Sequence, residues 1–258
     1  MPRARREGSL PTTREFFHAR FRELGTPKRA AGEKAYLKSP LQFHGVCAAD
    51  VTLACREFLE SRDGWSRLEL RAVVDDLFEA DYHELRSAGI GLLERKHALL
   101  AATDLPWLIG LIRRSSGWAH VDWLATRVIG PVVTESPRRD AVLRRWARDR
   151  DFWVRRTALL AQLRALRSGS GSFQLFDELA TPMLTEKEFF IRKAIGWVLR
   201  EVSKGRPDLV FQYLRANRGA VSGLTLREGA KYLSRSQRTS LGLSGRRPVT
   251  DGAKRSRK

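Results

Sequence analysis

A tryptophan and an aspartate, Trp118 and Asp122, stand four residues apart near the middle of the chain. On a helix, residues i and i+4 share one face, so this pair would present an aromatic ring beside a carboxylate. The chain carries 48 Lys and Arg against 29 Asp and Glu, a formal net charge of +19, which favours a polyanionic partner. Binding a polyanion gains nothing from a carboxylate, so Asp122 is a candidate for chemistry. Taken singly, each residue is more often structural, as a core tryptophan or as an acid paired with an arginine.

Basic and aromatic side chains are combined in two later segments. Arg155 and Arg156 stand near the start of a helix expected from Phe152, where guanidinium groups and free backbone N–H groups both favour phosphate. Lys193 and Trp197 belong to the second segment, residues 188–201. A solvated pair of arginines and a core tryptophan are the alternative interpretations of these segments.

Several other classes of chemistry find no support in the sequence. There is no Walker A loop and no dinucleotide fingerprint, and the five histidines are scattered without the spacing of metal ligands, so we expect no metal and no organic cofactor. No apolar run approaches the length of a membrane span, and the first residues lack the apolar stretch of a secretory signal. We therefore expect no membrane association and a cytoplasmic location, at the nucleoid if the source is bacterial.

Apolar residues recur at helical spacing almost from end to end, which predicts an all-α chain. Ser66 with Glu69, and Asp81 with Glu84, have the spacing of a capping box at a helix start. Gly196 in the middle of a helix suggests a close approach of two backbones. The periodicity predicts helices over residues 13–24, 28–37, 48–60, 67–79, 82–100, 105–114, 118–129, 137–148, 152–167, 173–183, 187–204, 207–217 and 224–233.

Paired helices joined by short loops, repeating every 35 to 45 residues or so, resemble the period of HEAT and armadillo repeats. We expect an α-solenoid of HEAT-like repeats over residues 12–233, with a concave basic groove for DNA. Residues 1–11 are expected to be a flexible basic segment. Residues 234–258, rich in Gly, Ser and Arg, are expected to be a disordered basic tail.

Four ordered segments of the sequence resemble the AlkD-like DNA alkylation-repair family of HEAT-repeat DNA glycosylases. They are YLKSPLQFHGV at 36–46, WAHVD at 118–122, WVRRTA at 153–158 and FFIRKAIGW at 189–197, within a match over about residues 16–233. The resemblance implies excision of N3- and N7-alkylated purines, such as 7-methylguanine and 3-methyladenine, from duplex DNA by hydrolysis of the N-glycosidic bond. It also implies that no metal or organic cofactor is used and that the lesion stays stacked in the duplex. No motif suggests the lysine nucleophile of a strand-cleaving lyase, so we expect base release only, by a monomer.

The resemblance assigns roles to individual residues. Asp122 corresponds to the catalytic carboxylate, and Trp118 and Trp197 correspond to aromatic walls around the sugar of the lesion. Arg156 corresponds to the arginine that contacts phosphate, with Arg155 one place away as the alternative. The candidate DNA-binding residues are completed by Tyr36, Lys38 and Lys193.

Two other functions are compatible with the same sequence. One is a HEAT-repeat protein that binds DNA or structured nucleic acid without chemistry, and the other is a protein scaffold. The presence of Trp118, Asp122 and Arg156 together favours the enzyme, because a binding protein has no use for the acid.

Overall fold

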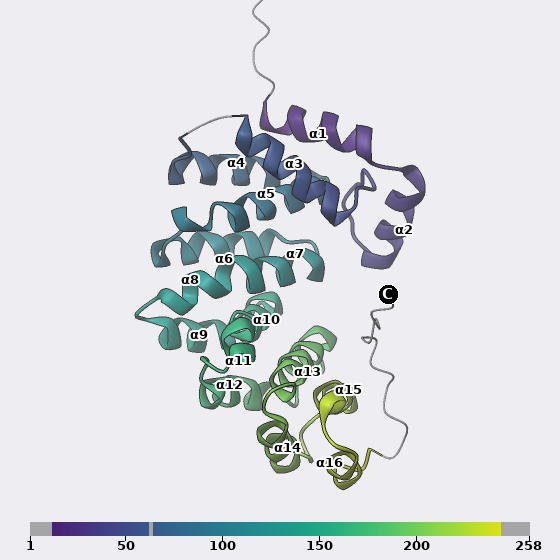
Figure 1. Cartoon of the computed structure of the whole chain (residues 1–258), viewed down its shortest axis with the longest axis vertical. Coiled ribbons are helices and arrows are strands. Elements are labelled where there is room, and N and C mark those ends of the chain that lie inside the picture. Colours follow the sequence, from purple (N-terminus) through teal and green to yellow (C-terminus); the bar gives the residue numbers. More distant parts are fainter. Residues whose placement is uncertain (1–11, 62–63, 244–258) are drawn as a thin grey trace, which may run out of the picture. The chain divides into compact units, whose positions relative to one another are not determined.

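The structure is a computed structural model that describes residues 12–61 and 64–243 (Figure 1). Within these residues it consists of helices and connecting loops with one isolated β-bridge, between Gln42 and Tyr82, which confirms the all-α prediction. The chain divides into two compact units at Pro137. The single HEAT-like repeat domain over residues 12–233 stays a prediction. The expectations for residues 1–11 and 244–258 lie outside the described residues, and the concave groove stays a prediction.

The first unit contains paired α-helices, in which α4 packs against α5 and α1 and α5 both pack against α3 (Figure 1). Short 3-10 turns at His97–Leu99 and Ala102–Asp104 join α5 to α6. The helices are α1 (Thr13–Leu24), α2 (Pro27–Leu37), α3 (Ala48–Glu60), α4 (Arg67–Glu79), α5 (His83–Arg95), α6 (Leu105–Arg114), α7 (Trp118–Trp123) and α8 (Gly130–Glu135).

Aromatic packing holds α1 on α3. The rings of Phe17 and Phe58 lie 5.0 Å apart between centroids, and Phe21 packs behind Phe17 at 5.6 Å. Phe17 and Phe21 are fully buried, one helical turn apart, because the apolar face of α1 repeats at four-residue spacing. Removing one such ring would cost about 3–5 kcal/mol of stability.

One of the two predicted capping boxes is confirmed. The Ser66 hydroxyl accepts from the Glu69 N–H and the Glu69 carboxylate accepts from the Ser66 N–H. The second prediction is wrong, because α5 begins after Tyr82 without a side-chain cap and Glu84 turns into the core instead of back to its own helix end.

The helix that starts at Trp118 continues past its predicted end at Ile129. A π-helical segment over Leu124–Ile129 carries it through Pro131 into α8. Proline lacks the N–H of an α-helical hydrogen bond and its ring crowds the carbonyl four residues earlier, and a locally wider helix accommodates both effects. The predicted end at Ile129 is therefore wrong, because the helix is distorted near Pro131 and does not stop there.

The second unit is also helical, and its helix α13 packs against both α10 and α15. A Cβ atom added at Gly196 of α13 would lie 2.7 Å from the Cβ atom of Glu228 on α15. This confirms that Gly196 allows a close helix approach. The helices are α9 (Arg139–Ala147), α10 (Phe152–Leu160), α11 (Leu163–Ser168), α12 (Phe173–Ala180), α13 (Phe189–Ser203), α14 (Pro207–Ala216), α15 (Gly223–Gly229) and α16 (Arg235–Ser240).

Helix α16 corrects the predicted start of the disordered tail. Ser234 caps this helix in a capping box with Gln237, whose side chain also donates to Asp208 at 2.7 Å. The Arg238 guanidinium donates to the carbonyl of Ala230. Residues 235–240 therefore form a capped helix in a stretch rich in Ser and Arg that was predicted to be disordered.

Candidate functional site

Helix α7 places Trp118 and Asp122 one turn apart, as their spacing predicts. The helix begins at Trp118, directly after Gly117, whose backbone is extended with φ 169° and which offers no side-chain cap. Both side chains are half-buried. The hydroxyl of Thr126 donates to the Asp122 carbonyl at 2.7 Å, which ties the residue to the π-helical segment that follows.

Tyr36 lies against Trp118. The two ring centroids are 5.8 Å apart and the rings stand nearly perpendicular at 86°, an edge-to-face contact. Tyr36 is 73% exposed, so this ring contact leaves most of the phenol open to solvent. Lys38 follows two residues later as the exposed, left-handed C-cap of α2. The structure thus brings Tyr36 onto Trp118, one helical turn before Asp122.

Helix α2, which carries Tyr36, has no buried residue and is held by the loop that follows it. Gly45 in this loop adopts φ +77°, and a Cβ atom there would lie 2.3 Å from the Thr26 carbonyl oxygen. Only glycine combines that conformation with that approach. The buried Glu84 carboxylate fixes the same loop by accepting the backbone N–H groups of His44, Gly45 and Val46 at 3.0, 2.7 and 3.3 Å.

Glu84 was missed as a positioning residue because its sequence spacing suggested a helix cap. Burial raises its pKa, and the backbone donors from the loop act in the opposite direction. An isolated acid ahead of the apolar run of α5 is the sequence signal that could have identified it.

Four of the five histidines, scattered along the sequence, form two pairs in the first unit. His18 Nδ1 and His44 Nε2 lie 3.0 Å apart, and the rings of His83 and His120 stack at 4.2 Å. Burial lowers the pKa of both His44 and His83 to about 4 and lowers that of His120 well below its ordinary value. These rings are therefore neutral at neutral pH. Among the described residues no group of three or more His, Cys, Asp or Glu could hold a metal ion.

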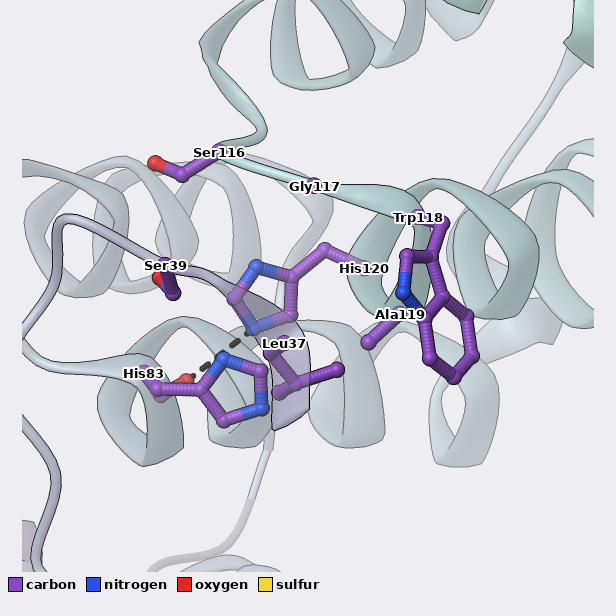
Figure 2. Close-up of a pocket in the computed structure, with 8 residues that line it drawn as sticks. All are labelled: Leu37, Ser39, His83, Ser116, Gly117, Trp118, Ala119 and His120. Atoms are coloured by element: carbon purple, nitrogen blue, oxygen red, sulfur yellow. Dashed lines mark hydrogen bonds between the residues drawn. The ribbon is translucent and has the colours of Figure 1, made fainter. Parts of the chain in front are cut away.

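A pocket adjoins Trp118 on the side of these histidines (Figure 2). It is small and open to solvent, with a volume of about 10 Å³, which is room for about one water molecule. Leu37 and Ser39 line it from the end of α2, His83 from α5, and residues 116–120 from the start of α7. The indole of Trp118 is thus shared between the pocket and the Tyr36 contact.

The two candidate arginines differ in their surroundings within the second unit. Arg155 forms an ion pair with Glu186, 2.8 Å from Nη2 to Oε2, and donates to the Asp149 carbonyl. Arg156 is only 2% exposed and donates to the Phe190 carbonyl. Both arginines thus have structural partners, and the sequence alone does not predict these partners because they lie more than thirty residues away.

Trp197 and Lys193 lie one turn apart on α13, with the indole half-buried and the lysine exposed. The Lys193 ammonium lies 5.7 Å from the centroid of the Phe189 ring. Helix α10 packs on α13 through Trp153 and Phe190, whose centroids are 4.8 Å apart. The predicted site residues therefore form one group on α2 and α7 in the first unit and another on α10 and α13 in the second.

The family model for the DNA alkylation repair enzyme matches residues 17–233. The chain belongs to this family. The match spans both units and every candidate residue named above. None of the described helices has the length and apolar character needed to cross a membrane.

The solved structures that are similar to the chain include the following two. One is described as a predicted DNA alkylation repair enzyme from Enterococcus faecalis, with 25% identity, a TM-score of 0.72, and coverage of 82% of this chain and 97% of that one. The other is smu.31 from Streptococcus mutans UA159, with 15% identity, a TM-score of 0.54, and coverage of 72% and 92%. This second likeness concerns the fold alone. No curated protein matches the chain.

Proposed function

We propose that this family member is a monofunctional DNA glycosylase that hydrolyses the N-glycosidic bond of N3- and N7-alkylated purines in duplex DNA. Membership of the DNA alkylation repair enzyme family supports a role in repair. The observation that carries the proposal is the placement of Asp122 one turn after Trp118, with Tyr36 against the indole. The net charge of +19 favours binding of phosphate, whereas a carboxylate beside aromatic rings favours a cation.

The chemistry needs little from the protein. Alkylation at N3 or N7 makes the purine cationic and a good leaving group, so bond cleavage leaves the electron pair on the base and a positive charge on the deoxyribose. The Asp122 carboxylate would stabilise that charge and orient the water that adds to the sugar. The face of Trp118 would attract the same cation by about 0.5–2 kcal/mol. The reaction requires no metal or organic cofactor.

Contacts to phosphate would come from basic groups in both units. Lys38 and Lys193 are exposed, and we propose them as direct phosphate ligands. Arg155 is paired with Glu186, and Arg156 donates to the Phe190 carbonyl. We therefore propose that both arginines stabilise the packing around α10 and add positive charge to the surface that faces the DNA strand. We further propose that the lesion remains stacked and that the protein acts as a monomer.

Base release from methylated duplex DNA tests this function. The Asp122→Asn variant should retain DNA and release 7-methylguanine at least about a hundredfold more slowly, the scale of removing a preorganised electrostatic group. Asp81→Asn is the matched control, because Asp81 is an exposed acid of the same unit. Equal rates for the wild type and Asp122→Asn would overturn the mechanism. A wild type that retains DNA but releases no base would instead support the non-catalytic binding protein.

A further inference from the structure

One arginine of helix α5 connects two loops of the first unit. The Nε atom of Arg86 donates to the carbonyl of Ala80, which lies in the loop before its own helix, at 2.9 Å. Its Nη1 atom donates to the carbonyl of Arg114 at 2.9 Å and to the hydroxyl of Ser116 at 3.1 Å. Arg114 is the last residue of α6, and Ser116 belongs to the connection to α7. The half-buried Arg86 side chain therefore joins the start of α5 to the segment that precedes α7.

The segment that Arg86 holds leads directly into the candidate site. Figure 2 shows Ser116 and Gly117 on the short stretch of chain that enters the helix of Trp118. Gly117 has an extended backbone and offers no side-chain cap to this helix. Because glycine has no side chain of its own to fix the chain direction, contacts from other elements must fix it.

A second contact ties the beginning of α7 to α5. The buried His120 ring donates from Nε2 to the carbonyl of His83, 3.1 Å away. The contact through Ser116 and the contact through His120 lie on the two sides of Trp118 along the chain. Both contacts come from the first turn of α5, since His83 and Arg86 are three residues apart. The position of the indole is therefore set by α5 from both sides.

The contact between Arg86 and its own loop recurs in the second unit. Arg86, Arg155 and Arg192 are each the fourth residue of their helix, and each donates to the carbonyl six residues earlier, at 2.9, 2.8 and 2.7 Å. Helix α7 carries the buried, apolar Val121 at its fourth position. The segment before α7 therefore receives its guanidinium from the preceding helix α5 instead of from α7 itself.

The geometry of these contacts requires a guanidinium group. Arg86 uses Nε toward one loop and Nη1 toward the other, and the planar group holds these donors in fixed and different directions. A lysine at this position would keep the positive charge, but all its donors sit on one atom. It could not reproduce both contacts at once.

We propose that Arg86 is a positioning residue of the candidate site. By joining the loop before α5 to the segment before α7, it fixes where the Trp118 indole and the Asp122 carboxylate stand. Its effect on base release rests on the proposed function. A displacement of reacting groups by about 1 Å can slow a reaction by about a hundredfold, so an arginine that touches no substrate can still affect the rate.

Two measurements on the full chain test this proposal with the charge-conserving variant Arg86→Lys. Hydrogen exchange followed by mass spectrometry reports the protection of residues 114–122 without DNA. Single-turnover base release from methylated duplex, at saturating protein, reports the reaction. Arg14→Lys is the matched control, because Arg14 also donates from Nε to a main-chain carbonyl, that of Asp76 at 3.1 Å, but joins α1 to α4. Ser116→Ala is the milder second variant, since it removes only one of the three acceptors of Arg86.

We expect Arg86→Lys to accelerate exchange within residues 114–122 and to slow base release at saturating protein by at least about tenfold. Its DNA affinity should stay within about twofold of the wild type, because the charge is retained. Ser116→Ala should change both quantities in the same direction by less, and Arg14→Lys should leave both unchanged.

Four outcomes would overturn the positioning role of Arg86. They are unchanged exchange in residues 114–122, exchange raised equally throughout the first unit, an unchanged rate of base release, and a rate loss that saturating protein abolishes. A wild type that releases no base would refute the proposed glycosylase, and the exchange measurement would still decide whether Arg86 holds the start of α7.

Discussion

Glu84 Oε1 accepts a hydrogen bond of 2.7 Å from the backbone N–H of Gly45. The same carboxylate accepts from His44 and Val46, so one buried side chain satisfies three successive N–H groups of the loop that follows Tyr36. An unsatisfied buried donor costs about 1–3 kcal/mol. The position of α2, which buries no residue of its own, therefore depends on this acid.

Replacing Glu84 by alanine should lower the free energy of unfolding by several kcal/mol, measured by chemical denaturation. Glu60→Ala is the control, because Glu60 is an exposed acid whose ion pair with Arg56 spans 3.7 Å. Exposed pairs of this kind contribute about 0–1 kcal/mol. Similar losses for the two variants would contradict the role of Glu84 in holding the loop.

Two partly buried histidines lead us to expect a loss of stability on acidification. Burial lowers the pKa of His44 and His83 to about 4, whereas in the unfolded chain each has its ordinary value near 6.5. Between these values the unfolded state binds more protons, so the free energy of unfolding falls as the pH falls. Their contribution is complete above about pH 6.5 and is lost progressively toward pH 4.

Thermal unfolding between pH 7.5 and 4.5 measures this effect. Replacing His83 by glutamine removes one titrating group, and the variant should show a shallower decrease of the melting temperature over this range than the wild type does. A wild-type melting temperature that stays constant down to pH 4.5 would exclude the burial of neutral histidines.

The contact between α13 and α15 predicts opposite effects for two glycine-to-alanine substitutions. Gly196→Ala would place a Cβ atom 2.7 Å from the Cβ atom of Glu228 and 3.3 Å from the Thr225 Cα atom. Overpacking of this kind costs about 1–3 kcal/mol. Gly32→Ala meets nothing within 4 Å in the exposed helix α2 and should stabilise the protein by about 0.5–1 kcal/mol. Denaturation of both variants checks the sign, and a stabilising Gly196→Ala would refute the close approach.

The aromatic contact at the site predicts a moderate loss of activity. Trp118→Ala removes the indole that adjoins Tyr36 and, under the proposed function, the sugar cation. A loss of about 0.5–2 kcal/mol of transition-state stabilisation corresponds to base release about 2- to 30-fold slower. Trp107→Ala is the matched control, since this indole stacks with Arg71 and donates to Asp75 away from α7. Equal rates in single-turnover assays of the two variants would contradict a direct role for Trp118.

Helix positions followed from the sequence wherever an apolar stripe was bounded by a clear start or stop signal. The predicted bounds of α1, α3, α4 and α6 agree with the structure at both ends, because a cap or a proline marks the start of most of them. The continuation through Pro131 could not be predicted, because it depends on packing that compensates for the missing hydrogen bond.

The sequence predicted the contacts between side chains less well than it predicted the positions of the helices. Spacing placed Trp118 and Asp122 on one helix, but the contact with Tyr36 joins residues more than eighty positions apart. Glu84 could serve as a helix cap or as a loop anchor, and only the tertiary path of residues 44–46 decides between them. The pairing of the histidines is likewise a consequence of the fold.

The salt dependence of DNA binding distinguishes direct phosphate ligands from structural arginines. Each phosphate contact adds about 0.9 to the slope of log affinity against log salt concentration. Lys38→Gln and Lys193→Gln should each reduce that slope by about this amount, because both ammonium groups are exposed. Arg155→Gln should disturb the pair with Glu186 and lower stability, with a smaller change in slope, since its guanidinium also donates to the Asp149 carbonyl. An unchanged slope for both lysine variants, measured by fluorescence anisotropy with duplex DNA, would remove these lysines from the proposed interface and shift the electrostatic contribution to other basic residues of the chain.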